Sequence, residues 1–278
     1  MQRKMTLFLV IAVITLVCVS TGFPDNVQEK KVRTIRSIVT SDTILSGMIA
    51  SLLPSSRYNV KSILPPGQCP GHYDIKLSDI EKAKKADLTV SFRGMPFMDK
   101  AGSDAGAQIF VDAGGRNWMT PVSYIYGLSL LADELCKRFP EDTDVIMSRK
   151  NGAISDVKAG ANLLVEKIKR AGISGCPIIT SSMQKEPLTW MGFRVVGEYG
   201  RPEAMSAREL VRLTKIGKDQ NIIMVADNLQ SGPDTGKGIA ETLGVPHVVL
   251  TNFPSEKGYL ATLGENVNSV LLTVKKKR

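Results

Sequence analysis

A cysteine, a histidine and a tyrosine lie within five residues of one another in the run "PPGQCPGHYD", which begins at Pro65. They are Cys69, His72 and Tyr73. A thiol and an imidazole are ligands that soft or borderline transition-metal ions accept. The run is rich in proline and glycine, which predicts a loop. It could hold part of a metal site, or it could be an ordinary turn in which the histidine is a hydrogen-bonded structural residue.

Counting limits the kind of metal site. The chain has 2 histidines, and the second, His247, begins an expected strand "HVVLT". A zinc site built on three imidazoles is therefore excluded. Two other sets of side chains could bind a ligand: arginines, whose forked cations suit an anionic group, and methionines, which with Cys69 and His72 suit a soft ion such as Cu(I). Each set also has an ordinary explanation, since methionines fill gaps in packing and arginines pair with carboxylates. The sets are Arg93, Arg116 and Arg201, and Met95, Met119 and Met183.

Strand-like and helix-like segments alternate along the chain, which predicts parallel sheets covered by helices. Two expected helices carry capping boxes at their start, Ser78 with Glu81 and Ser206 with Glu209. A pattern from Asp144 to about Arg170 has apolar residues every three or four positions and predicts one helix of roughly 40 Å. We therefore expect two α/β lobes joined by a long spine helix. The expected strands are 33–41, 58–64, 87–92 and 107–113, then 176–182, 193–199, 221–227 and 247–252.

The N-terminus has the layout of a secretory signal. Arg3 and Lys4 precede an apolar run over 5–19 and then small residues. We expect the mature chain to begin near Phe23 and to be exported to the periplasm or the extracellular space. Cys18 leaves open an anchor in the membrane, through a lipid or an uncleaved signal. The domains predicted on this basis are a signal peptide (1–22), an N-terminal lobe (23–143), a spine helix (144–171) and a C-terminal lobe (172–278).

Neither charge nor motifs indicate nucleic acid binding or catalysis. The formal net charge is +9, but the basic residues are spread along the chain and the one dense run is 275–278. The segment "GPDTGKGIAETLG" lacks the spacing of a phosphate-binding loop, and no nucleophile elbow occurs. We therefore expect a protein that is not an enzyme and has no nucleic-acid partner.

In open parallel sheets, ligands bind beyond the carboxyl ends of the strands. If the lobes face each other, the loops after the strands line one cleft, whereas His247 lies at the opposite end of its strand. The rule selects twelve candidate residues. Those for ligand binding are Arg93, Met95, Arg116, Met119, Ser181, Ser182, Met183, Arg201, Asp227 and Asn252, and those for a metal ion are Cys69 and His72.

This organisation resembles the zinc and manganese substrate-binding proteins of ABC importers. "PGHYDIKLSDIEKAKKADLTVSFRG" is similar to the family's Pro-His-x-Tyr, Pro-Ser-Asp and "kADLv" pattern, "NWMTP" to its His-x-Trp-Leu-Asp-Pro segment, and "GIAETLGVPHVVLTN" to its late helix and strand. The resemblance covers nearly the whole mature chain. It implies an α/β fold of two Rossmann-like parallel-sheet lobes with a long spine helix, and a metal ion bound between the lobes and presented to an ABC permease.

Most of the family's metal ligands are replaced. Its first histidine falls on Gly71, one place before His72, and its second on Arg116. Its third falls near Ser181 or Ser182, and its carboxylate near Thr251 or Asn252. The resemblance thus implies a divergent, monomeric receptor for a metal ion or a metal-containing ligand. A receptor for a small anionic ligand held by the cleft arginines, an enzyme acting on a small anionic substrate, and an interaction protein without a ligand remain alternatives.

Overall fold

Two parallel four-stranded sheets organise the protein in a computed structural model, which describes residues 35–99 and 107–275. The first sheet has the strand order β2-β1-β3-β4. Its strand β3 is buried along its whole length, as expected for a strand covered on both faces. The strands are β1 (Arg36–Thr40), β2 (Tyr58–Ser62), β3 (Leu88–Phe92) and β4 (Ala107–Val111).

The second sheet repeats this arrangement with the order β6-β5-β7-β8. In each sheet the second strand in sequence lies at one edge, and the fourth lies at the other. The connection from the first strand to the second therefore runs in one direction across the sheet, and the connection to the third strand runs in the other. Open α/β sheets bind ligands at this point of reversal, between the ends of the first and third strands. The strands are β5 (Pro177–Ser181), β6 (Arg194–Tyr199), β7 (Val225–Asn228) and β8 (His247–Leu250).

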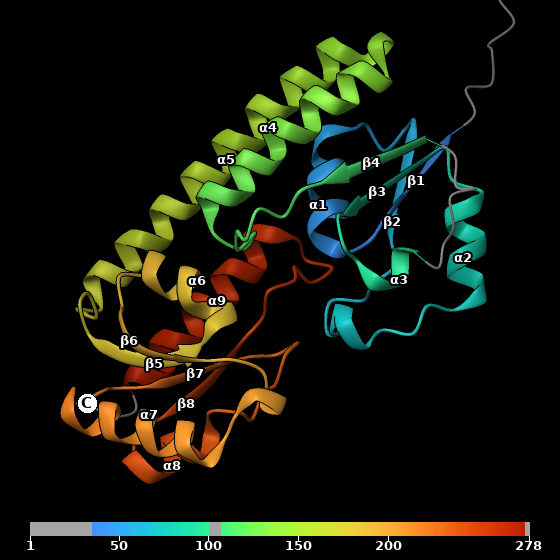
Figure 1. The fold of residues 1–278 in the computed structure, drawn as a ribbon. Coiled ribbons are helices and arrows are strands. Elements are labelled where there is room, and N and C mark those ends of the chain that lie inside the picture. The colour runs from blue at the N-terminus through green and yellow to red at the C-terminus, as the bar shows by residue number, and fades with distance from the viewer. Residues whose placement is uncertain (1–34, 100–106, 276–278) are drawn as a thin grey trace, which may run out of the picture. The chain divides into compact units, whose positions relative to one another are not determined.

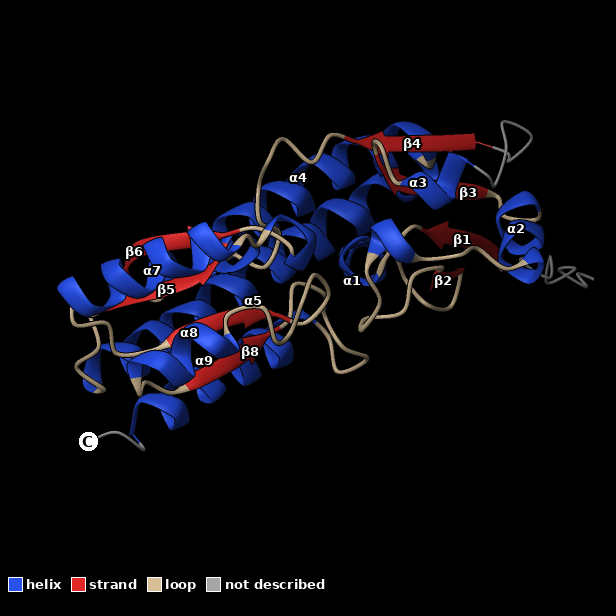
Figure 2. Ribbon diagram, turned by 60° about the horizontal axis from the view of Figure 1, so that its bottom comes forward, coloured by secondary structure: helices blue, strands red, loops and turns tan. Residues whose placement is uncertain are grey.

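Helices flank both sheets (Figure 2). The longest, α5, has 28 residues and runs from beside the first sheet to beside the second (Figure 1). It packs against α1 and α4 at one end and against α9 farther along. The helices are α1 (Thr43–Leu52), α2 (Leu77–Lys84), α3 (Pro96–Asp99), α4 (Pro121–Arg138), α5 (Thr143–Arg170), α6 (Lys185–Trp190), α7 (Ala207–Asp219), α8 (Lys237–Leu243) and α9 (Tyr259–Lys275).

The predicted fold class and spine helix are confirmed, and one of the two capping boxes is wrong. Ser206 caps α7, because its Oγ accepts the N–H of Glu209 at 3.2 Å. Ser78 instead lies inside α2, whose N-cap is Lys76 without a side-chain bond. The first turn closes earlier than predicted, since Lys76 O already accepts the backbone N–H groups at positions 79 and 80.

The buried carboxylate of Asp42 fixes the start of α1. Its Oδ1 accepts the N–H groups of Ile44 and Leu45 at 2.9 and 3.1 Å, and its Oδ2 accepts the hydroxyl of Ser41 at 2.7 Å. Burial raises the pKa of Asp42, and these three hydrogen bonds oppose that rise. The first turn of α1 is thereby held at the carboxyl end of β1.

The segment between β8 and α9 joins the two lobes through apolar packing. Phe253, Tyr259 and Leu263 follow the second sheet in sequence, but they belong to the apolar core of the first lobe. The ring of Tyr259 stacks on that of Tyr124 with centroids 3.7 Å apart, and its hydroxyl donates to Met119 O at 3.0 Å. Burial raises the pKa of Tyr259, so the phenol stays neutral. The lobes therefore share a core at this junction.

Among the described residues, no helix combines the length and the apolar character needed to cross a bilayer. The predicted signal peptide, 1–22, lies outside the described residues.

A matched pair of helical glycines tests the packing around α1 and α4. A Cβ at Gly127 would lie 2.7 Å from Trp118 and 2.8 Å from Met48, whereas a Cβ at Gly152 would meet nothing within 4 Å. Gly127→Ala should lower the free energy of unfolding by about 1–2 kcal/mol, because overpacking outweighs the gain in helix propensity. Gly152→Ala should raise it by about 0.5–1 kcal/mol. Urea denaturation measures both, and equal shifts of the same sign would contradict this packing.

Candidate functional site

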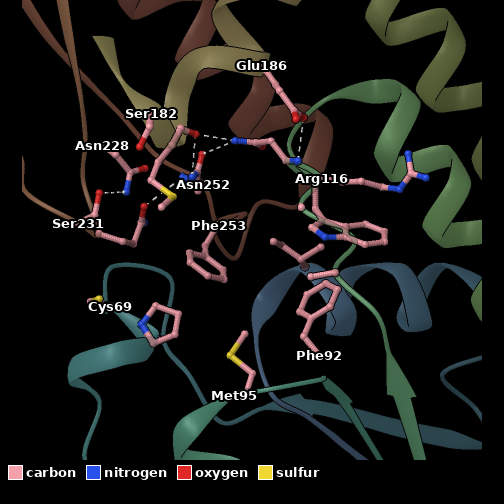
Figure 3. A pocket seen from close by; sticks show the side chains of 18 of the residues that line it. Cys69, Phe92, Met95, Arg116, Ser182, Glu186, Asn228, Ser231, Asn252 and Phe253 are labelled. Carbon is pink, nitrogen blue, oxygen red and sulfur yellow. Dashed lines mark hydrogen bonds between the residues drawn. The ribbon is translucent and has the colours of Figure 1, made fainter. Parts of the chain in front are cut away.

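A cavity of about 340 Å³ lies where the carboxyl ends of the two sheets meet (Figure 3). Every described strand contributes to it through the residues that end or follow that strand. Side chains far apart in the sequence are thus brought to one site, as the rule for parallel sheets predicts. In strand order from β1 to β8, examples are Ile44, Cys69, Arg93, Trp118, Met183, Arg201, Gln230 and Asn252.

Eight of the twelve sequence-predicted candidates line this cavity, and four lie elsewhere. The eight are Cys69, Arg93, Met95, Arg116, Ser182, Met183, Arg201 and Asn252. The four are His72, Met119, Ser181 and Asp227.

The four candidates outside the lining have identifiable surroundings. His72 is exposed, at the end of the single turn Pro70–His72. Met119 is fully buried in the core of the first lobe, and Ser181 is buried at the last position of β5. Asp227, predicted at the end of its strand, lies one residue before the end of β7 and does not line the cavity.

The carboxylate of Asp227 forms its hydrogen bonds within the second lobe. It is fully buried and accepts the hydroxyl of Tyr199 at 2.6 Å and the N–H of Gly236 at 2.9 Å. It also pairs with Nε2 of His247 at 2.7 Å. Tyr199 lies on β6, Gly236 directly before α8 and His247 on β8. This carboxylate on β7 therefore holds the packing of β6, β7 and β8 together.

The three predicted arginines differ in where their guanidinium groups lie. Arg116 stacks over Tyr126 at 4.6 Å, and its side chain extends away from the cavity (Figure 3). Arg93 lies 5.6 Å from the ring of Phe110. Arg201 covers Gly71, where a Cβ would lie 3.1 Å from Nη1. Within 35–99 and 107–275, none of the three arginines forms an ion pair.

The sulfur atoms are the candidate soft ligands. Cys69, Met95 and Met183 all line the cavity, and Cys69 is a free thiol. In the part of the chain that the structure describes, no group of three histidine, cysteine or acidic side chains is placed to hold a metal ion. The donor set at the cavity therefore does not fit a hard ion held by imidazoles and carboxylates.

Neutral amides connect the lobes across the rim of the cavity. Asn117, from the loop after β4, donates through Nδ2 to Met183 O at 2.6 Å and to Asn252 Oδ1 at 3.2 Å. Its backbone N–H donates to Glu186 Oε2 at 2.8 Å, and Figure 3 shows these bonds beside the labelled glutamate. Asn252 Nδ2 also donates to Met183 O, at 3.1 Å. The loop after β4 is thus tied to the loops after β5 and β8.

Gln230 makes a second connection between the lobes. Gln230 Nε2 donates to Pro66 O in the first lobe and to Thr251 Oγ1 in the second, both at 2.7 Å. Gln230 Oε1 accepts the N–H of Asn252 at 3.1 Å. Buried Gln184 joins this set, because its Nε2 donates to Asn252 Oδ1 at 2.8 Å. We call these four side chains the amide network: Asn117, Gln184, Gln230 and Asn252.

Sequence reasoning did not single out Asn117, Trp118, Glu186 or Gln230. The strand-end rule covers the positions of the first two. Asn117 and Gln230 carry neither charge nor a metal-ligand signature, so their residue type gave no reason to choose them. Glu186 is charged but lies on α6, beyond the loop that follows β5. The signal that remained was position alone.

Two parallel sheets that share a ligand-sized cavity at their strand ends, with one long helix alongside, define a two-lobed solute-binding protein. Residues 38–271 match the family model described as "Zinc-uptake complex component A periplasmic", and the chain belongs to this family. The resemblance to metal-binding substrate-binding proteins of ABC transporters is thereby confirmed, and the family is one of receptors rather than enzymes. A search of curated proteins gives no match.

Solved structures share the fold at low sequence identity. FpvC from Pseudomonas aeruginosa in complex with Mn²⁺ has a TM-score of 0.73 at 14% identity, covering 88% of this chain and 100% of that chain. ZnuA has a TM-score of 0.72 at 14% identity, covering 86% and 99%. The laminin-binding protein of Streptococcus agalactiae, described as a bifunctional protein with adhesin and metal transporting activity, has a TM-score of 0.71 at 16% identity, covering 87% and 100%.

The amide network predicts a specific loss of stability. Asn117→Asp keeps the Oδ1 acceptor that receives the N–H of Met119, but it replaces the donor that binds Met183 O with a charged acceptor. We expect the free energy of unfolding to fall by about 1–2 kcal/mol, because two hydrogen bonds between the lobes are lost and the new carboxylate faces the oxygen atoms that accepted them. We also expect faster hydrogen exchange in 182–186. Asn162→Asp, at an exposed position of α5, is the control and should shift stability by less than about 0.5 kcal/mol. Equal effects of the two substitutions would contradict the role of the network.

Proposed function

We propose that this chain is the exported receptor of an ABC importer of the metal-importer type, and that the cavity between the sheets holds its ligand. The observation that carries the proposal is the convergence of all eight described strands on one cavity. Family membership supports the receptor role. The receptor acts as a monomer that presents its ligand to a membrane permease.

The ligand in this proposal is a transition-metal ion or a metal-containing molecule. Cys69, Met95 and Met183 line the cavity, and thiolate and thioether sulfur favour a soft or borderline ion. His72 lies in the same turn as Cys69, with its N–H donating to Cys69 O at 3.1 Å. His72 is exposed and outside the lining, so its imidazole joins the sulfur donors in this proposal only if the turn rearranges when the ligand binds. Among similar structures, AdcA is bound to Zn(II), and FpvC is in complex with Ni²⁺ or Mn²⁺.

A small anionic ligand is the second candidate. Arg93 comes from the first lobe and Arg201 from the second, and both line the cavity. Neither forms an ion pair within the described ranges. An anion placed between them would contact both lobes. A third possibility is turnover of such an anion by an enzyme. Cys69 and Ser182 line the cavity, but among the described residues no histidine lines it beside them to act as a base.

The receptor works by a difference in affinity between lobe arrangements. A ligand that contacts both lobes binds their closed arrangement more tightly and shifts the population toward it. The shared core at Tyr259 and the amide network limit this movement to small rocking. In this proposal residues 1–22 direct export, an N-terminal lobe (23–143) and a C-terminal lobe (172–278) enclose the ligand, and 144–171 is the spine. After export, the signal is either cleaved before Phe23 or retained as an N-terminal membrane anchor.

Elemental analysis and native mass spectrometry of the secreted protein test the metal assignment. We expect a transition metal in near-stoichiometric amount, lost at least tenfold from Cys69→Ser and reduced in His72→Ala. Cys136→Ser is the matched control, because Cys136 is a free, half-buried cysteine on α4 that does not line the cavity. A bound organic anion without metal, unchanged by these substitutions, would favour the arginine-held ligand. If no ion, anion or complex binds, the receptor proposal fails.

A further inference from the structure

We propose that the ligand of this cavity is an amphipathic organic anion. It has a flat apolar body and an acidic end, and any metal enters as its complex rather than as a bare ion. This inference rests on the proposed function, because it takes the cavity between the sheets as the ligand site. It adds the chemical class of the ligand.

The first observation is an apolar wall. Ile44, Phe92, Trp118 and Phe253 line the cavity, and each is at most 9% exposed. The rings of Phe92 and Trp118 lie with their centroids 5.1 Å apart. A bare ion gains nothing from such a wall, since removing an ion from water opposes binding. An apolar or aromatic body gains from burial against it and from ring contacts.

The second observation is an unsatisfied donor in that wall. The indole Nε1–H of Trp118 is enclosed and has no hydrogen-bond partner within residues 35–99 and 107–275. A buried donor without an acceptor is destabilising, and native structures rarely retain one without a reason. Since the other three residues of the wall are hydrocarbon side chains, they cannot accept the hydrogen bond. An oxygen atom on a ligand that packs against the indole would supply the acceptor once the side chains that enclose the nitrogen shift on binding.

The third observation is the charge on the two sides of the wall. Arg93 and Arg201 line the cavity from opposite lobes, and Glu186 is the acidic residue in the lining. The carboxylate of Glu186 already accepts the N–H of Asn117, which connects it to the first lobe. Two guanidinium groups therefore line the cavity together with one carboxylate, which is already hydrogen-bonded. This balance favours a carboxylate or another oxyanion as the acidic end of the ligand.

Size agrees with the same class. The cavity of about 340 Å³ falls within the roughly 300–1,000 Å³ of sites that take small organic molecules. A single ion fills only a small part of that volume. The remaining space, the apolar wall and the arginines are accounted for together by a small organic acid or by its metal complex.

Calorimetric titration of the mature, full-length protein tests the proposal with probes that separate its parts. The probe with both parts is 2,3-dihydroxybenzoate, used alone and as its Fe³⁺ complex. Inorganic phosphate supplies an anion without an apolar body, and benzyl alcohol supplies an apolar body without charge. Zn²⁺ alone supplies the bare ion. We expect 2,3-dihydroxybenzoate, in one or both forms, to bind at least tenfold more tightly than any of the other three.

Two substitutions locate the binding. Trp118→Phe keeps an aromatic ring but removes the donor, and it should weaken binding of 2,3-dihydroxybenzoate about fivefold. Arg201→Gln should weaken it tenfold or more. The matched controls are Trp190→Phe, at the other tryptophan, and Arg194→Gln, on β6 outside this cavity. Both controls should bind within twofold of the unmodified protein. Arg201 is exposed, so its variant folds even if the change at Trp118 disturbs the core.

The outcomes distinguish this inference from the proposed function. If Zn²⁺ alone binds at least as tightly as 2,3-dihydroxybenzoate, the inference is wrong and the metal receptor stands. If 2,3-dihydroxybenzoate binds but neither substitution weakens it beyond its control, the inference is also wrong, because the contacts named are not used. If none of the four probes binds, the inference is wrong, and the proposed function is decided separately by the elemental analysis and native mass spectrometry of the secreted protein.

Discussion

The apolar junction between β8 and α9 is the contact on which the site depends. Phe253 and Tyr259 come from the second half of the chain, yet they pack into the core of the first lobe. Burying aromatic side chains of this size is strongly favourable and does not depend on any ligand. The junction keeps the strand ends of both sheets around a common cavity. Without it, the arginines, sulfur atoms and amides would lie on two separate surfaces.

The amide network gives that arrangement a polar counterpart. Asn117 and Asn252 lie at or next to positions where the family resemblance places metal ligands, namely Arg116 and the Thr251–Asn252 pair. Here the loops are connected by hydrogen bonds of the chain itself. Part of the free energy that holds the lobes together is therefore present before any ligand binds. A ligand then has to supply only the remaining difference between open and closed arrangements, which is the quantity that sets its effect on their populations.

The repeated α/β order and the spine could be predicted because both depend on apolar periodicity, which is local in the sequence. The cavity could be predicted in outline, because parallel strands direct their carboxyl ends to one edge. Individual residues were harder. Asp227 lies one residue before the end of its strand rather than at it, and a shift of one residue is enough to turn a side chain to the other face. The direction of Arg116 depends on Tyr126, which lies on a different element, so strand-end position alone could not give it. The interaction of Trp118 with its surroundings depends on tertiary packing in the same way.

The placement of Arg201 over Gly71 has a consequence for substitutions in the turn that carries Gly71. The resemblance places the family's first histidine at position 71, and a Cβ there would begin 3.1 Å from the guanidinium. A histidine at 71 and an arginine in this pose compete for the same space. A side chain at position 71 therefore requires the guanidinium, the far end of a flexible and exposed side chain, to move aside. Whether the turn at Gly71 can accept a larger residue is thus decided by the pose of an arginine from the other lobe.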